Sequence, residues 1–165
     1  MSRLEVRLEN DLRLEEDILT ACLKNLSKAY RKARKAREAC LSSPTTEDFH
    51  TWRKRTKDVG YQLRLIESAW DPVLECQRQS IESIADLLGD DHDLAVLLEL
   101  LPDLELSPRR RVSIEGILSA KRRVLQREAL REGGRVYAEK PRAFRRRLVA
   151  IVRAARDVGQ APSVG

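Results

Sequence analysis

The first 43 residues contain neither glycine nor proline, which is the longest uninterrupted helical signal in this chain. Pro44 follows directly and ends the segment. Either Asn10 or Asp11 could cap the start of a second helix, so the segment predicts one long helix or two shorter ones. Apolar and small side chains recur in it at helical spacing, at Leu19, Cys22, Leu26, Ala29, Ala33 and Cys40.

Glycine and proline divide the rest of the chain into further helical segments. We expect helices over about 47–68, 71–88, 90–101, 108–133 and from 140–141 onward. In this prediction Gly89 and Gly133–Gly134 end helices, Asp90 or Asp91 caps the one after Gly89, and residues 159–165 form a disordered tail. Short connections imply antiparallel neighbours, so the predicted fold is all-α, a single antiparallel helical bundle over residues 1–158.

Charge is segregated along the chain. Residues 28–64 carry a net charge of +7 and residues 108–165 carry +11, whereas residues 65–107 between them carry −10. In proteins with an ordinary solvated surface, acidic and basic residues more often alternate along the chain. With a total charge of +6 and an isoelectric point near 9.5, this pattern favours an acidic partner.

The cysteine pattern and the hydropathy exclude several classes of protein. Cys22, Cys40 and Cys76 are odd in number and widely spaced, so we expect buried, reduced thiols and neither a disulfide framework nor a zinc site. No apolar run reaches membrane length, and the N-terminus alternates charged residues with leucine. We therefore expect a cytoplasmic protein without a membrane span or secretion signal.

Two consecutive predicted helices carry cationic stripes. At about 100° per residue, one face of the first helix presents Lys24, Lys28, Arg31 and Lys35. One face of the second, opposite its apolar side chains, presents His50, Arg53, Lys54, Lys57, Tyr61 and Arg64. Ordinary solvated faces of amphipathic helices are the simpler explanation. Almost no acidic residue interleaves with these cations, however, and an external polyanion would relieve their mutual repulsion.

Three motifs follow one another in a specific order. They are Phe49–Asp58 (FHTWRKRTKD) with Tyr61–Leu65 (YQLRL), then Leu88–Leu97 (LGDDHDLAVL), then Tyr137–Phe144 (YAEKPRAF). Together they resemble the conserved histidine α-helical domain (CHAD) family over roughly residues 18–150.

This resemblance implies two pseudo-symmetric helical bundles around a basic cavity that binds inorganic polyphosphate. By matching position, the phosphate track comprises His50, Arg53, Lys54 and Lys57, with Arg31 and Lys35 from the preceding helix. The stripes themselves add Lys28, Tyr61 and Arg64. Each half of such a protein has a basic helix with a histidine near its start, and this chain has one such helix. Only the C-terminal of the two halves is therefore recognisable. The chain is thus a fragment that associates with a missing N-terminal half, a one-half variant, or a protomer that rebuilds the cavity as a homodimer.

Polyphosphate needs point charges and guanidinium groups along a track, which lysine and arginine supply. Readers of single-stranded nucleic acid add aromatic stacking, and only Tyr61 lies on a stripe, so we expect no sequence-specific nucleic-acid binding. The same ligand would bring the protein to polyphosphate granules. No nucleophile–base pair, glycine-rich phosphate loop or metal-spaced cluster is evident, so we expect binding without catalysis, cofactor or metal.

Other functions stay open. His50, His92–Asp93 and Asp103 mimic the ligand order of metal-dependent phosphohydrolases, so the chain could be a divergent enzyme of that kind or its accessory domain. A helical scaffold, or a nonspecific nucleic-acid binder, would also carry such a basic face.

Overall fold

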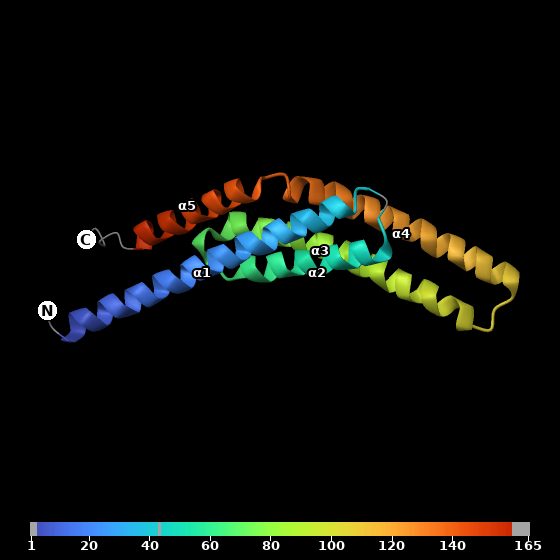
Figure 1. Cartoon of the computed structure of the whole chain (residues 1–165), viewed down its shortest axis with the longest axis horizontal. Helices are drawn as coiled ribbons and strands as arrows, with labels where there is room; N and C mark the ends of the chain where they lie inside the picture. The colour runs from blue at the N-terminus through green and yellow to red at the C-terminus, as the bar shows by residue number, and fades with distance from the viewer. Residues whose placement is uncertain (1–2, 43, 160–165) are drawn as a thin grey trace.

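A computed structural model describes the backbone of residues 3–42 and 44–159, and it is almost entirely helical (Figure 1). Five α-helices and two short 3-10 helices follow one another: α1 (Arg3–Ala39), α2 (Thr46–Arg64), η1 (Glu67–Ala69), α3 (Asp71–Leu100), η2 (Leu101–Asp103), α4 (Pro108–Val136) and α5 (Pro141–Gly159). No strand occurs in these two stretches. The all-α prediction is confirmed.

The helices form an elongated, arched molecule (Figure 1). Helices α1, α2 and α3 pack side by side in its middle, while α4 packs on α3 and α5 packs on α1. Beyond the ends of α1 and α2, helices α3 and α4 continue alone as a two-helix hairpin (Figure 1, right). The start of α1 and the end of α5 lie at the opposite end of the arch (Figure 1).

The core lies where α1, α2 and α3 meet. Trp52 of α2 and Tyr30 of α1 are the largest fully buried side chains, and the same core cluster contains aliphatic residues of α3 and α5. Helix α2 starts with a capping box: the Thr45 hydroxyl accepts from the Asp48 N–H at 3.2 Å, and the Asp48 carboxylate accepts from the Thr45 N–H at 2.8 Å. These contacts set where α2 begins, and its buried residues, among them Trp52 and Leu63, set where its polar face points.

The predicted helix end at Gly89 is wrong. Helix α3 runs through Gly89 to Leu100, and the glycine instead lets Arg53 of α2 lie close to the α3 backbone. A Cβ at Gly89 would be 3.3 Å from Arg53 Nε. Asp91 is no cap either, because it is buried in the middle of α3 and pairs with Arg122 of α4.

The glycine pair Gly133–Gly134 also lies inside a helix, since α4 continues to Val136. Gly133 sits against the indole of Trp52: a Cβ there would be 2.6 Å from ring atom Cζ2. The glycine is thus needed for packing rather than for termination.

Other expectations differ in detail. Helix α1 is unbroken at Asn10–Asp11. Helix α2 ends at Arg64 and not near Ser68, and η1 follows it after a turn. Cys40 is buried and Cys22 half-buried, but Cys76 is exposed. Gly159, the first residue of the predicted tail, is the last of α5, and the remainder of that tail (160–165) lies outside the described residues.

Candidate anion-binding site

A groove of about 610 Å³ runs between α1 and the start of α5. Its α1 wall is formed by Lys24, Ser27, Lys28, Arg31 and Arg34, and its α5 wall by Lys140, Pro141, Arg142 and Arg145. Seven of these nine lining residues are lysine or arginine, and none is acidic. A groove with this lining suits an anion and repels a cation.

Aromatic packing brings the two walls together. Tyr30 of α1 stacks on Phe144 of α5, with ring centroids 3.9 Å apart and planes 9° from parallel. The Tyr30 hydroxyl lies 3.2 Å from the carbonyl oxygen of Val136 and 3.1 Å from that of Glu139, and can donate to either. Burial raises the pKa of Tyr30 to about 12, with Glu139 adding to the increase, so the hydroxyl stays protonated as a donor.

Most of the groove's cations have no acidic partner. Arg34 pairs with Glu38 and also donates to the carbonyl oxygen of Glu139 at 3.3 Å. Within the part of the chain whose side chains the structure describes, no ion pair involves the other six. Because α5 begins at Pro141, the positive end of its dipole adds to the field of the groove.

The stripe of α2 faces a different neighbour, α3. The His50 ring lies 4.6 Å from the His92 ring, and the Arg53 guanidinium packs against Gly89. His50 Nδ1 and Arg53 Nε are buried and make no hydrogen bond to any residue that the structure describes. Burial lowers the pKa of His50, and Lys54 and His92 lower it further, which keeps the ring neutral unless an anion comes close.

Further along α2, the stripe meets the acidic residues of α3. Lys57 and Tyr61 line a smaller hollow with Glu82 and Asp86, and the Lys57 ammonium lies 5.9 Å from the centre of the Tyr61 ring. Arg64 pairs with Glu82 at 3.3 Å. This end of the stripe is therefore partly neutralised inside the molecule.

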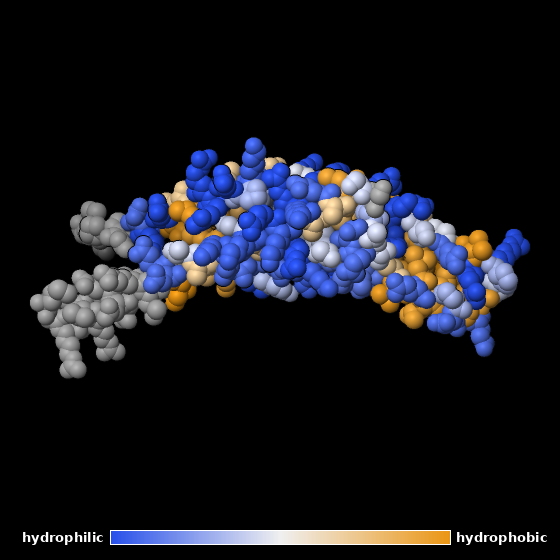
Figure 2. Space-filling view, in the orientation of Figure 1, coloured by the Kyte–Doolittle hydropathy of each residue, from blue (hydrophilic) through white to orange (hydrophobic). Residues whose placement is uncertain are grey.

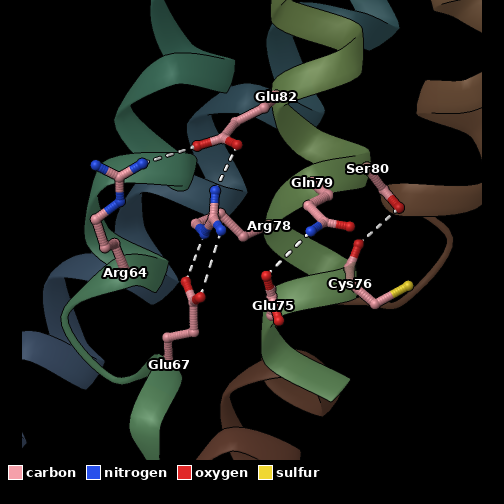
Figure 3. A network of polar contacts seen from close by, with 8 residues as sticks. All are labelled: Arg64, Glu67, Glu75, Cys76, Arg78, Gln79, Ser80 and Glu82. Carbon is pink, nitrogen blue, oxygen red and sulfur yellow. Dashed lines mark hydrogen bonds and ion pairs between the residues drawn. The ribbon is translucent and has the colours of Figure 1, made fainter. Parts of the chain in front are cut away.

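A network around Arg78 fixes that pairing (Figure 3). Arg78 of α3 donates to Glu67 of η1 and to Glu82, so that Glu82 accepts from both Arg78 and Arg64. The network ties η1 and the end of α2 to α3, which makes Arg64 a structural residue as well as a surface cation.

The structure thus divides the predicted site into two groups. Lys28 and Arg31 belong to the α1–α5 groove, while five of the six α2 residues lie beside α3. The sixth, Lys54, is exposed on α2. Lys35 is exposed on α1 and does not line the groove. A single seam spanning both helices was the expectation, but the two stripes lie on different flanks of the α1–α2 pair.

Sequence reasoning missed the α5 wall of the groove. Lys140, Arg142 and Arg145 belong to the C-terminal basic block, and the spacing of the two arginines, three residues apart, was an available signal. That this wall faces α1 follows only from the packing of Phe144 on Tyr30.

The phosphohydrolase-like residues do not assemble. Although His50 and His92 are adjacent, no group of three or more histidine, cysteine, aspartate or glutamate residues within the described residues could hold a metal ion. None of the described helices combines the length and apolar character that crossing a membrane requires.

The family model described as CHAD domain matches residues 2–102. The match includes the first two motifs, at Phe49–Asp58 and Leu88–Leu97, whereas Tyr137–Phe144 lies beyond it. No curated protein and no solved structure matches the chain.

Proposed function

Because this chain belongs to the CHAD family, we propose that it binds inorganic polyphosphate in the α1–α5 groove and catalyses no reaction. The observation that carries the proposal is the groove lining, which has seven cationic side chains and no carboxylate. Six of these cations lack an ion pair among the described residues, so their charge is available to a ligand. A cytoplasmic location and association with polyphosphate granules are parts of the same proposal.

The ligand class follows from the chemistry of the lining. Polyphosphate carries about one charge per residue and offers no base to stack or read, and the groove lining contains no aromatic side chain. Lys24, Lys28 and Arg31 repeat at four and three residues, so they line one face of α1 with a spacing of about one helical turn. A flexible anionic chain can contact all of them in succession.

A second contact region is proposed at His50, Arg53 and Lys54. Nδ1 of His50 and Nε of Arg53 are buried and lack hydrogen-bond partners among the described residues, so a phosphate oxygen would satisfy the arginine once its side chain turns away from Gly89. The histidine would bind as a protonated donor, since a nearby anion raises its pKa. A long polymer could occupy both regions, whereas a short one would occupy the groove alone.

Titration with long-chain polyphosphate at two salt concentrations tests the proposal, with single-stranded DNA as competitor. If several phosphates are neutralised, log Kd should rise steeply with log salt, by about 0.7 for each contact. DNA should compete only at a large excess of charge. Preference for DNA would identify a nucleic-acid binder, and binding indifferent to salt would show that the groove does not act through its charges.

A further inference from the structure

The α3–α4 hairpin is not buried by the rest of the molecule. No residue of α3 after Ala95 is buried, and none of α4 before Leu125. Figure 2 shows apolar surface gathered at this end of the molecule, in contrast to the hydrophilic middle. Two helices alone leave one face of each uncovered, and a bundle normally buries that face against further helices.

The exposed apolar side chains follow helical spacing. On α3 they are Val96, Leu97 and Leu100, and on α4 Ile117 and Val124 flank the small Ala120. Leu100 is 52% exposed and Ile117 66%. Residues 117, 120 and 124 fall on one face of α4 because they are three and four apart, whereas Val112 lies about 140° away from Ile117.

The charges of the hairpin complement one another. Residues 90–105 carry six acidic residues and no lysine or arginine, whereas residues 109–127 carry seven lysines and arginines and one glutamate. Asp91 with Arg122 is an ion pair that joins these two segments. Asp93, Glu99, Lys121 and Arg123 are exposed, and none of them takes part in an ion pair among the described residues.

From this placement we propose that a second copy of the chain docks face to face on the α3–α4 hairpin, related by a two-fold axis that runs along the hairpin. This axis sets the acidic α3 of each copy against the basic α4 of the other and buries the apolar face between them. An axis across the hairpin would instead oppose acidic α3 to acidic α3. Charge complementarity therefore favours a second copy of the chain, in the orientation that the axis along the hairpin gives.

Sedimentation of the whole chain over a range of concentrations tests the docking. The wild type should show a monomer–dimer equilibrium, and Leu100→Asp with Ile117→Asp should shift it to monomer, weakening association at least about tenfold. Ile18→Asp with Leu65→Asp makes the same change at comparably exposed sites outside the hairpin and should keep the dimer. Unchanged helicity and melting temperature establish that each variant is folded.

A charge exchange tests the orientation. One variant carries Asp93→Lys and Glu99→Lys, and the other Lys121→Glu and Arg123→Glu. Each alone should weaken the dimer, because the two substituted side chains then meet charges of their own sign on the facing helix, and an equimolar mixture should recover it as a heterodimer in native mass spectrometry. A wild type that stays monomeric at every concentration overturns the proposal, as do hairpin variants that dimerise like the wild type.

Discussion

The buried carboxylate of Asp91 is joined to the guanidinium of Arg122 by hydrogen bonds of 2.9 and 3.4 Å, which connect α3 to α4 at the base of the hairpin. Asp91 is only 1% exposed, and Gln126 donates a further hydrogen bond of 2.9 Å to it. The carboxylate is therefore neutralised by Arg122 and hydrogen-bonded from the next turn of α4 by Gln126. This arrangement fixes how far the two helices are shifted along each other.

Removal of Arg122 should consequently destabilise the protein far more than removal of its neighbour. Arg122→Ala leaves a buried carboxylate without its cation and should lower the free energy of unfolding by about 3 kcal/mol, at the low end of the range for such pairs because Gln126 still donates. Arg123→Ala, at an exposed position, should change it by less than about 0.5 kcal/mol. Urea unfolding measures both.

The double substitution Asp91→Leu with Arg122→Leu provides the control for that prediction. It removes both charges together, so most of the lost stability should return. If Arg122→Ala and Arg123→Ala unfold at the same urea concentration, the ion pair does not hold α3 to α4.

Two glycines of α4 should respond in opposite directions to the same substitution. At Gly133 a Cβ would be 2.6 Å from the fully buried Trp52 ring, so Gly133→Ala should destabilise by about 1–3 kcal/mol. At Gly116 nothing lies within 4 Å, and Gly116→Ala should stabilise by about 0.5–1 kcal/mol through higher helix propensity. Thermal unfolding of the two variants, monitored by circular dichroism, measures the two changes in stability. Equal shifts in melting temperature would contradict the close approach of α4 to Trp52.

Proline signals in the sequence predicted helix starts correctly, whereas the predicted start at Asp90 or Asp91 is wrong. The prolines at 72 and 141 mark the beginnings of α3 and α5, because proline at the first helical position restricts the backbone of its own residue. The roles of Gly89 and Gly133 were not predictable in this way. Each depends on a side chain of another helix, Arg53 or Trp52, that only the folded chain brings near.

The same limit applies to the candidate site. Periodicity on α1 correctly places Lys28 and Arg31 on one polar face, and the structure puts both in the groove. Which helix faces them cannot be read from that periodicity, and the α5 wall was therefore missed. Likewise, the amphipathic pattern of α2 does not reveal that Arg64 meets Glu82 of α3, since the partner lies on a separate helix.

His50 should make stability depend on pH in the acidic range. Its pKa in the folded protein is lowered, chiefly by burial, so between that value and about 6.5 the unfolded chain binds more protons than the folded one. Stability should therefore fall as pH decreases through this range, and this part of the loss should be absent in His50→Gln.

Urea unfolding of both proteins between pH 7.5 and 5, in a buffer without phosphate, measures the difference. Adding polyphosphate should reduce the difference between them, because a bound anion stabilises the protonated ring. Parallel pH profiles for the wild type and His50→Gln would show that the histidine does not titrate differently in the folded state.

The α1–α5 groove can be tested with a matched pair of charge reversals. Arg31→Glu with Arg142→Glu reverses two residues that line the groove, one on each wall. Lys32→Glu with Arg146→Glu makes the same change in net charge on the same two helices, at exposed positions outside the groove lining. Long-range electrostatics affects both proteins alike, so a difference in polyphosphate affinity reports direct contact.

The groove variant should bind polyphosphate at least about 100-fold more weakly, since a hydrogen bond to a charged group contributes about 1.5–3 kcal/mol and two are lost. The slope of log Kd against log salt should also decrease by about 1.4, for two phosphate contacts. The control should show a smaller loss of affinity, removed by raising the salt concentration, because it acts only through the screened field of the whole protein. Equal losses in the two variants would mean that the polymer follows the overall positive charge and not the groove.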